Sequence, residues 1–388
     1  MFDVILNKNE EINILNGVPF IYNNEISKFN GEIESGKVCR VLNSNNEFVC
    51  YGFFNSSSKI MVRVLSLNEN DKIDYDFFYK RIKEAISLRE SLSFDNTCRL
   101  IFSEADFLPG LVVDKYADIL VCQFTSLGMF LIKEDIKNIL VSLLNPRGIY
   151  MRNDTNINLK EGISLDKGFL YNEFDTKVLV KENDIKFYVD VKDGQKTGYF
   201  LDQKLNRDNL KYYVKDKVVL DCFSHTGGFA LNAIKNGAKK VLAVDISEKA
   251  CNDILNNAKL NDFTNLDVCC DDVFEFIKNS EKMKEFDVIV LDPPAFTKSK
   301  ETVKSAYKGY KKINKEALLN IKKGGYLLTF SCSGHMTMDL FFDMLKEAVS
   351  ESKRRVQMID FRIQSPDHPT LLDFNSLYLK CVILRVLE

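Results

Sequence analysis

The sequence predicts an α/β protein in which a mostly parallel sheet, covered by helices on both faces, follows two smaller domains. Three observations predict this class. Strand-like and helix-like segments alternate after about residue 184, short strands separated by polar turns fill the first 70 residues, and the stretch between these regions mixes helices with strands. The length of 388 residues agrees with two or three domains.

The first domain, which we expect at residues 1–70, is a small module rich in strands. Two strand-like runs, 47–55 and 59–67, carry aromatic and β-branched side chains, and the polar turns 43–46 and 55–58 bound them. Short strands with frequent polar turns are typical of a β-rich domain.

A middle domain of mixed α+β type is expected at residues 71–183. Its first segment, 71–95, is charged but carries apolar side chains at helical spacing, so we expect an amphipathic helix there. The remaining segments are expected to form strands at 98–104, 111–116, 119–124 and 148–154 and a helix at 126–144.

The third domain, residues 184–388, is expected to contain the parallel sheet. It opens with an entry hairpin formed by 185–194 and 199–203. Strand-like runs then follow at 217–221, 240–245, 266–270, 286–292, 324–332 and 377–387, with a helical segment after each of the first five. In such a sheet, ligands bind at the carboxyl ends of the strands.

Charge, cysteine and histidine content argue against several classes of protein. The formal net charge is -2, so no global positive field points to nucleic acid. Ten cysteines occur without a CxxC pair and only three histidines are present, so we expect no metal site and a reducing compartment. The beginning of the chain lacks the pattern of a signal peptide, and no run of about 18 apolar residues would cross a membrane. A cytoplasmic protein is therefore expected.

The turn after the first strand of the parallel sheet has features of a cofactor site. In DCFSHTGGF (221–229), Gly227 and Gly228 allow the backbone to approach a ligand closely. A lone glycine-rich turn is a weak signal, and an ordinary strand-to-helix turn is the alternative.

Acidic residues end the next two strands. Asp245 would accept two hydrogen bonds from ribose hydroxyls, although Ser247 offers the alternative that this segment only caps a helix. Asp271 and Asp272 end the third strand, where a carboxylate would accept from an adenine amino group. Helix capping is again the alternative, and we favour Asp272 over Asp271. These markers alone leave a nicotinamide cofactor open.

The loop after the fourth strand favours a methyl donor over a nicotinamide. LDPPAF (291–296) places Asp292 before Pro293 and Pro294, whose rings stiffen the loop at the mouth of the site. A target base could stack on Phe296. A dehydrogenase has no use for such a loop.

Together these motifs resemble a known family over essentially the whole chain. The matching segments are LNGVPFIYNNEI (15–26), SEADFLPGLVVDKY (103–116), DGQKTGYFLDQKLNRD (193–208), DCFSHTGGF, VDISEKA, DDVFEF, DPPAFTKSK and FSCSGHM. They resemble the bacterial 23S rRNA cytosine-C5 methyltransferases. The resemblance implies a PUA domain, an α+β middle domain and a class I Rossmann-like methyltransferase domain with a mostly parallel seven-stranded sheet.

The resemblance also implies S-adenosylmethionine as the cofactor and adds residues to the site. It implies that GQKTGYFLDQ folds over the cofactor. With the glycines and acids above, the expected cofactor contacts are Phe200, Phe223, Ser224, Thr226, Gly227, Gly228, Asp245, Ile246, Asp271, Asp272 and Asp292. The expected substrate contacts are Gln203, Arg207, Pro293, Pro294, Phe296, Lys298 and Lys300.

Methylation of cytosine carbon 5 requires a nucleophilic cysteine, because that carbon does not attack a methyl sulfonium unaided. A thiolate that adds to carbon 6 makes carbon 5 enamine-like, and a base removes the carbon-5 proton after methyl transfer. We expect Cys332, which ends the fifth strand, to be the nucleophile and Asp292 to be the acid or base. The alternatives are a small buried side chain for Cys332 and a structural ligand of the loop for Asp292.

One position departs from the pattern of related enzymes. Many other RNA cytosine-C5 methyltransferases carry a second cysteine in the strand-four motif, at the position that Ala295 holds here. The site therefore has one cysteine candidate, and Asp292 is the residue that could resolve the covalent adduct.

A lysine-rich segment follows this loop. Seven lysines and a single acid, Glu301, lie between residues 298 and 315, with two tyrosines among them. We expect the lysines to neutralise RNA phosphates with salt-dependent affinity, although a solvated helix face is the alternative. The basic run at 353–355 is weaker support. Only the resemblance suggests the N-terminal β module as a second RNA contact.

The expected function is methyl transfer to carbon 5 of a cytosine in 23S rRNA, or in a large-subunit precursor, through a Cys332–C6 adduct. Two alternatives stay open. One is N-methylation of guanine or adenine in rRNA, in which case Cys332→Ala would keep activity. The other is a non-catalytic RNA-binding assembly factor, which would not bind S-adenosylmethionine. We expect no membrane partner, and the oligomeric state is open, with a homodimer as one state.

Overall fold

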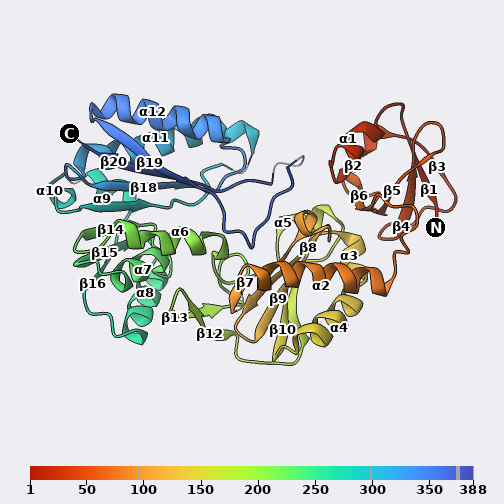
Figure 1. Ribbon diagram of the computed structural model, residues 1–388, viewed down its shortest axis with the longest axis horizontal. Coiled ribbons are helices and arrows are strands. Elements are labelled where there is room, and N and C mark those ends of the chain that lie inside the picture. Colours follow the sequence, from red (N-terminus) through yellow and green to blue (C-terminus); the bar gives the residue numbers. More distant parts are fainter. Residues whose placement is uncertain (95, 279, 298, 373–375, 388) are drawn as a thin grey trace. The chain divides into compact units, whose positions relative to one another are not determined.

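The computed structural model describes residues 1–388 except 95, 279, 298, 373–375 and 388. The chain divides into two compact units, whose elements are labelled in Figure 1. The first unit contains Met1–Val180, Tyr188–Leu201 and Pro366–Ser376. The second unit contains Lys181–Phe187, Asp202–Ser365 and Leu377–Glu388. Each unit is therefore assembled from separate parts of the sequence.

A six-stranded sheet forms the beginning of the first unit, with strand order β2-β6-β5-β4-β1-β3. The two runs expected as strands are β5 (Phe48–Phe54) and β6 (Ile60–Ser66), which pair antiparallel. The other elements are β1 (Asp3–Leu6), α1 (Glu11–Leu15), β2 (Phe20–Tyr22), η1 (Asn23–Glu25), β3 (Ile26–Asn30) and β4 (Val38–Leu42). Fully buried Val4, Ile21 and Val62 lie in the core of this β-rich module, as expected.

A second sheet in the same unit has the order β11-β10-β9-β8-β7 and gives the expected mixture of helices and strands. Its strands are β7 (Thr97–Phe102), β8 (Leu111–Tyr116), β9 (Ile119–Phe124), β10 (Gly148–Asn153) and β11 (Asp166–Tyr171). The associated helices are α2 (Tyr75–Ser91), η2 (Ser103–Asp106), α3 (Leu127–Leu131), α4 (Lys133–Leu144) and α5 (Asn156–Lys160). Asp74 caps α2 by accepting a hydrogen bond from Phe77 N.

The single helix expected at 126–144 is two helices, α3 and α4, which meet at Ile132 with φ -100° and ψ 19°. Gly128 of α3 lies so close to β5 that a Cβ there would overlap the ring of Phe53. We attribute the break at Ile132 to this packing, because α3 is held against β5 and α4 is not.

Buried charges hold distant segments of the first unit together. Arg89 of α2 is fully buried and donates to both carboxylate oxygens of Asp106, at 2.6 and 2.8 Å. The same guanidinium donates to the backbone oxygens of Arg99 and Asp367. A second buried pair joins Arg99 to Asp114, which also accepts from Thr197 in the 193–208 motif. These bonds connect α2, β7 and β8 with the two later segments of the first unit, Tyr188–Leu201 and Pro366–Ser376.

Replacing Arg89 with alanine should destabilise the first unit by about 3–5 kcal/mol, because Asp106 would be left buried and unpaired. Urea denaturation followed by circular dichroism measures the loss. Arg147→Ala is the matched control, since Arg147 forms an exposed pair with Asp118 worth at most about 1 kcal/mol. A loss for Arg89→Ala no larger than that of the control would contradict this role.

The entry hairpin differs from the expectation, which paired 185–194 with 199–203 and was wrong. The two-stranded sheet consists of β12 (Lys177–Glu182) and β13 (Ile185–Asp190). Asn183 and Asp184 join these strands with positive φ angles of 49° and 61°, the conformation that a tight two-residue hairpin turn requires. Residues Leu201–Gln203 form the 3-10 helix η3.

The second unit contains a seven-stranded sheet with the order β16-β15-β14-β17-β18-β20-β19. Its first five strands pair in parallel, whereas β20 is antiparallel to both neighbours. The strands are β14 (Val218–Cys222), β15 (Lys240–Asp245), β16 (Leu266–Cys270), β17 (Val288–Leu291), β18 (Tyr326–Ser331), β19 (Val356–Arg362) and β20 (Lys380–Val386). The expected mostly parallel, Rossmann-like sheet is therefore present.

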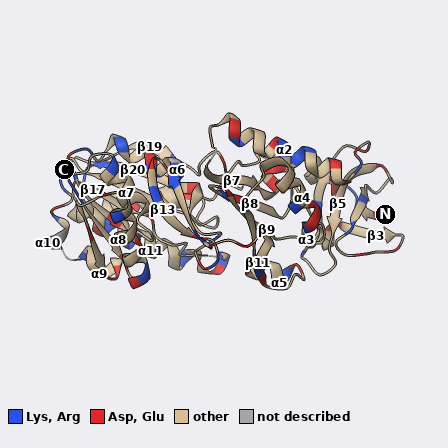
Figure 2. Cartoon of the chain, turned by 90° about the horizontal axis from the view of Figure 1, so that it is seen from below, with Lys and Arg blue, Asp and Glu red and all other residues tan. Residues whose placement is uncertain are grey.

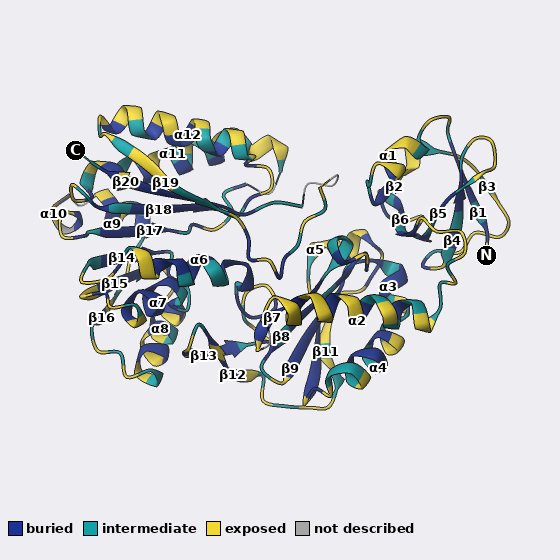
Figure 3. Ribbon diagram, viewed as in Figure 1, coloured by how far each residue is buried: buried dark blue, intermediate teal, exposed yellow. Residues whose placement is uncertain are grey.

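Helices cover both faces of this sheet (Figure 1). They are α6 (Lys204–Asp208), η4 (Asn209–Tyr212), α7 (Gly228–Lys235), α8 (Glu248–Leu260), α9 (Val273–Lys278), α10 (Ser280–Met283), η5 (Lys300–Thr302), α11 (Val303–Asn320) and α12 (Met338–Ser352). Neighbouring strand residues point to opposite faces: Ile289 packs in the core with α9, α11 and α12, and Val288 packs in the core with α7 and α8. Figure 3 shows the central strands buried.

The edge strand β19 was not expected from the sequence. Its residues are mostly half-buried or exposed, so its apolar pattern is weak. It pairs antiparallel with the buried strand β20 and completes the sheet. No helix in the described parts of the chain is both long and apolar enough to cross a membrane.

Candidate cofactor and catalytic site

The loop between β14 and α7 is shaped by Asp221. Its Oδ2 accepts from the Ser224 hydroxyl at 2.5 Å and from Ala230 N at 3.0 Å, so one carboxylate joins the loop to the first turn of α7. Its Oδ1 is buried without a hydrogen-bond partner among the described residues. Burial raises the pKa of Asp221 to about 7.

The backbone of this loop requires a glycine at Gly227. Its φ of +87° lies in the left-handed region, and a Cβ there would approach Ile254 of α8 to 3.2 Å. Phe223 and His225 also have positive φ angles, so the loop curls tightly between the strand and the helix. Ser224 is buried and Thr226 is half-buried beside Gly227. A ligand could therefore approach this backbone closely, as the sequence indicated.

Asp245 ends β15 beside this loop. Its Oδ2 accepts from His225 N at 2.9 Å and its Oδ1 from Ser247 N at 3.0 Å. The capping alternative applies to Ser247, whose side chain accepts from Ala250 N at the start of α8. Asp245 is half-buried, and the next residue, Ile246, is 69% exposed. A carboxylate next to an exposed apolar side chain suits a ribose and the flat face of a purine.

The two acids after β16 have different surroundings. Asp272 is half-buried, and its Oδ1 accepts from Phe274 N at 2.7 Å at the start of α9. Asp271 is exposed, and its Oδ1 accepts from Asp272 N. Asp272 therefore caps α9, which was the alternative expected for this pair, while its position at the strand end also suits an adenine contact.

Asp292 and Cys332 follow the neighbouring parallel strands β17 and β18. Cys332 is half-buried, and its Sγ lies 3.9 Å from the Pro293 carbonyl oxygen. The Ser333 hydroxyl donates to Thr297 O at 2.8 Å. These contacts fix the turn after β18 against the 292–297 loop. The thiol therefore lies beside Asp292's loop at the carboxyl ends of the strands and is not packed in the interior.

Gln203 contacts the carboxylate of Asp292. Gln203 Nε2 donates to Asp292 Oδ2 at 3.0 Å, and its Oε1 accepts from Asn206 Nδ2 at 2.7 Å. Gln203 is almost fully buried, so it orients Asp292. Arg207 is also buried and forms a two-bond pair with Glu182, at 2.7 and 2.9 Å. A contact between Arg207 and an RNA phosphate would require breaking that pair.

Aromatic rings fix the positions of two loops of the site. Phe296 packs against Tyr310 with ring centroids 4.5 Å apart and against Phe274 at 5.8 Å. Phe274 in turn meets Phe223 at 6.2 Å. This row ties the loops after β14 and β17 to α9 and α11. Phe296 is half-buried within it, so its ring supports the loop in addition to any contact with a base.

Comparison with known proteins identifies the family. Residues 4–67 match the model of a PUA-like domain, and residues 168–383 match that of the S-adenosylmethionine-dependent methyltransferases. Ribosomal RNA large subunit methyltransferase I of Aliivibrio fischeri is 37% identical over 376 residues, which cover 95% of each chain. The protein of the same name from Escherichia coli is 35% identical and covers 99% of each chain.

This chain belongs to the ribosomal RNA large subunit methyltransferase I family of S-adenosylmethionine-dependent methyltransferases. A solved structure, the methyltransferase SMU.776 complexed with SAH, has the same fold, with a TM-score of 0.85, 22% identity and full coverage of both chains. The expected family, the PUA-like domain and S-adenosylmethionine dependence are thereby confirmed.

The lysine-rich segment of this methyltransferase lies mostly on α11. Lys311 pairs with Glu347 and Glu351 of α12, and Lys315 pairs with Glu351. Lys300, Lys304, Lys308 and Lys312 are at least partly exposed, and Lys298 lies outside the described residues. In the view of Figure 2, basic and acidic residues are interspersed over the second unit. The local excess of positive charge is therefore smaller than the sequence alone indicated.

The GQKTGYF motif of the methyltransferase belongs to the first unit as far as Leu201. The Thr197 hydroxyl contacts Asp114 and the Tyr116 hydroxyl, and Tyr199 N donates to Tyr116 Oη. The ammonium of Lys196 lies 4.5 Å from the ring centre of Phe200. The expected cofactor contact of Phe200, and the folding of this motif over the cofactor, stay predictions from the resemblance.

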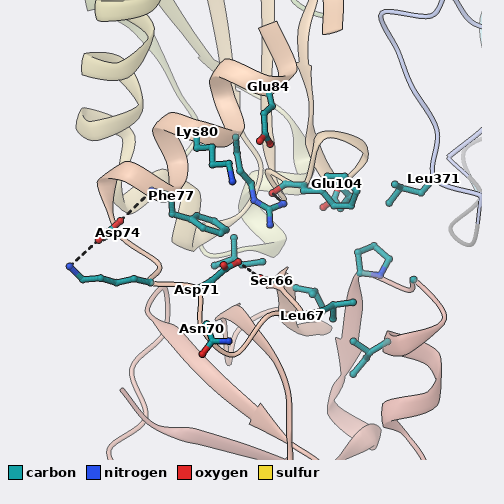
Figure 4. Close-up of a pocket in the computed structure, with 18 of the residues that line it drawn as sticks. Ser66, Leu67, Asn70, Asp71, Asp74, Phe77, Lys80, Glu84, Glu104 and Leu371 are labelled. Atoms are coloured by element: carbon teal, nitrogen blue, oxygen red, sulfur yellow. Dashed lines mark hydrogen bonds and ion pairs between the residues drawn. The ribbon is translucent and has the colours of Figure 1, made fainter. Parts of the chain in front are cut away.

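A cavity of about 730 Å³ lies in the first unit, between the β-rich module and α2 (Figure 4). Three basic and five acidic residues line it, which does not favour an RNA backbone. Its acids have internal partners: Asp71 binds Ser66, Asp74 caps α2 and Glu104 pairs with Arg63. Within the described residues, no group of three or more His, Cys, Asp or Glu side chains is placed to hold a metal ion.

Sequence reasoning missed one charged residue of the site, Lys380. It begins β20, is 2% exposed and donates to backbone oxygens in the turn after Cys332. Its signal was a single lysine in the apolar run LYLKCVILRVL (377–387).

The raised pKa of Asp221 predicts how stability depends on pH. The folded protein retains the Asp221 proton at pH values where the unfolded chain has lost it. The stability that this proton provides is therefore complete below pH 3.8, the ordinary pKa of an aspartate, and is lost as the pH rises through the folded-state pKa of about 7. Asp221→Asn cannot ionise, so its free energy of unfolding should fall less steeply over that interval. Urea denaturation at a series of pH values measures the two slopes, and equal slopes would contradict the assignment.

Proposed function

We propose that this chain transfers a methyl group from S-adenosylmethionine to carbon 5 of a cytosine in 23S rRNA. The names of its relatives specify ribosomal RNA of the large subunit. The carbon-5 assignment is supported by the position of half-buried Cys332 beside the Asp292–Pro293 loop, at the carboxyl ends of two adjacent parallel strands. A base-methylating enzyme that works at carbon 5 needs a thiol at that place.

The residues at the ends of β14, β15 and β16 fit S-adenosylmethionine. Under this proposal, Asp245 accepts from the ribose hydroxyls, Ile246 covers the adenine and Asp272 accepts from the adenine amino group. Phe223, Ser224, Thr226, Gly227 and Gly228 surround the methionine portion, and Asp271 and Phe200 are further candidates. S-adenosylmethionine supplies an electrophilic methyl group on sulfur when bound. The domains proposed for this arrangement are 1–70, 71–183 and 184–388.

Cys332 forms the covalent bond in the proposed reaction. Its thiolate adds to carbon 6 of the cytosine, and the electron pair of the 5,6 double bond becomes available at carbon 5. Carbon 5 then forms its bond to the methyl group. Removal of the carbon-5 proton restores the double bond and expels the thiolate from carbon 6. Cysteine, base and ring thus return to their starting states with one methyl group added.

Asp292 holds or moves a proton in this scheme. Gln203 fixes its Oδ2, which leaves the carboxylate oriented in the loop beside Cys332. Asp292 holds the cytosine ring at its protonated nitrogen or accepts the carbon-5 proton, the step that a second cysteine would otherwise assist. Ala295 occupies the position of that second cysteine.

The RNA would approach over the loop after β17 and the start of α11. Pro293, Pro294 and Phe296 are proposed to shape the pocket for the flipped base. Lys298, Lys300 and the exposed lysines of α11 are proposed to contact phosphates, with salt-dependent affinity. Gln203 is proposed to act on the substrate through Asp292, which its amide orients. The proposed contact of Arg207 with the substrate would require opening its pair with Glu182. We also propose that the protein is cytoplasmic and that it forms a homodimer.

Asp245→Asn should weaken the binding of S-adenosylmethionine by about 10- to 100-fold, because the amide cannot form the charged hydrogen bonds to both ribose hydroxyls. Isothermal titration calorimetry measures the dissociation constant. Asp262→Asn is the control, since Asp262 lies in the turn after α8 and is not part of the proposed site. Unchanged affinity in Asp245→Asn would remove this carboxylate from the cofactor site.

Cys332→Ala should abolish carbon-5 methylation while leaving the binding of S-adenosylmethionine intact. The test maps 5-methylcytosine in 23S rRNA from cells that lack the gene and carry either the wild-type or the Cys332→Ala chain. Cys270→Ala is the matched control, because Cys270 is an exposed cysteine at the end of β16. Full methylation by Cys332→Ala would favour a nitrogen target. The absence of any lost 5-methylcytosine in cells without the gene would refute the carbon-5 assignment.

A further inference from the structure

Lys380 places a buried ammonium group next to the turn that contains Cys332. It is the first residue of β20 and pairs with Ser331, the last residue of β18. Its Nζ donates to Ser333 O at 2.6 Å, Met336 O at 2.5 Å and Tyr378 O at 2.8 Å. All three donor positions of the ammonium are thus used, two of them on the turn after Cys332.

The partners of Lys380 are neutral. The structure shows no ion pair between Lys380 and any described acid. Burial of an ammonium without a carboxylate is costly, and burial lowers the pKa of Lys380 to about 8, while the nearby Cys332 acts in the opposite direction. A purely structural contact with three backbone oxygens would not require a charged group. A positive charge beside Cys332, in contrast, stabilises the thiolate form of its side chain.

Three titratable groups near the turn after Cys332 do not supply a positive charge. Asp292, after β17, is an acid and cannot carry a positive charge. Tyr310 of α11 accepts from the Ser331 hydroxyl, and burial raises its pKa to about 12, so it is neutral. Burial raises the pKa of the Cys381 thiol on β20 well above its ordinary value, so it is neutral as well. Lys380, in contrast, is a cation whose charge interacts with Cys332.

We propose that Lys380 is a positioning residue whose ammonium fixes the turn after Cys332 and holds the Cys332 sulfur as a thiolate. The inference rests on the proposed function in one respect, that Cys332 is the nucleophile. Because a thiolate and not a thiol adds to cytosine carbon 6, the charge would act on the first covalent step. Lys380 itself touches neither cytosine nor methyl donor.

The test measures the alkylation of Cys332 by iodoacetamide as a function of pH, in the full-length chain without RNA or S-adenosylmethionine. Mass spectrometry of the Cys332 peptide gives the rate, and the exposed Cys270 in the same sample reports on the reagent and the fold. In Lys380→Gln, the midpoint for Cys332 should rise by about one pH unit, which makes alkylation at neutral pH about tenfold slower. The profile of Cys270 should not change.

Lys380→Met separates charge from hydrogen bonding. The amide introduced by Lys380→Gln can still donate to the turn, whereas the thioether introduced by Lys380→Met cannot. If the charge is responsible, both variants should shift the midpoint for Cys332 upward. Lys323→Gln removes the same charge from an exposed residue before β18 and should leave Cys332 unchanged. A wild-type profile for Cys332 in Lys380→Gln would overturn the proposal.

The wild-type chain provides a test that does not depend on how the variants fold. Its Cys332 should react with a midpoint below that of the same cysteine in the urea-unfolded chain, and an equal or higher midpoint would overturn the proposal. Failure here is distinct from failure of the proposed function. Cys332→Ala that still methylates carbon 5 would refute the nucleophile, whereas an unshifted midpoint with inactive Cys332→Ala would refute only the role of Lys380.

Discussion

The parallel pairing of β17 with β18 is the constraint on which the site depends. Parallel strands end at the same edge of a sheet, so Asp292 and Cys332 are brought together although 39 residues separate Pro293 from Cys332. The contact of the Cys332 sulfur with Pro293 O and the hydrogen bond from the Ser333 hydroxyl to Thr297 O hold the segments after β17 and β18 side by side. Without this register, the thiol and the carboxylate would not lie beside one another.

The same edge of the sheet collects the proposed cofactor residues. β14 and β15 lie on the other side of β17, so Gly227 and Asp245 belong to the same row of strand ends. The aromatic row from Phe223 to Tyr310 then supports the loops from the face covered by α11. The proposed methyl-donor site and the proposed nucleophile therefore lie at one edge of one sheet, which agrees with the need to align the reacting atoms before chemistry.

Much of this arrangement could be predicted from the sequence. The apolar run that contains β17 and the alternation of strands and helices fix a parallel sheet, and its topology then places the strand-end residues together. β19 escaped prediction because an edge strand with exposed side chains has little apolar pattern. The hairpin partner of β13 differs from the expectation because Asn183 and Asp184, and not the later glycine-rich segment, form the turn.

The partners of the site residues could not be predicted, because they come from segments far apart in the chain. Gln203 binds Asp292, Glu182 neutralises Arg207, and Glu347 neutralises Lys311 only once the sheet and its helices are assembled. The sequence indicates the chemical type of each of these residues but not its partner. Lys380 shows this as well, since the partners of a single charge in an apolar strand become evident only when β18 lies beside β20.

The proposed covalent bond between Cys332 and the target cytosine can be trapped with RNA that carries 5-fluorocytosine, because fluorine at carbon 5 cannot leave as a proton and the adduct persists. With S-adenosylmethionine present, we expect a protein–RNA complex that survives denaturation and whose RNA fragment is attached to the Cys332 peptide. Attachment to another cysteine, or methyl transfer to RNA without any such complex, would contradict it.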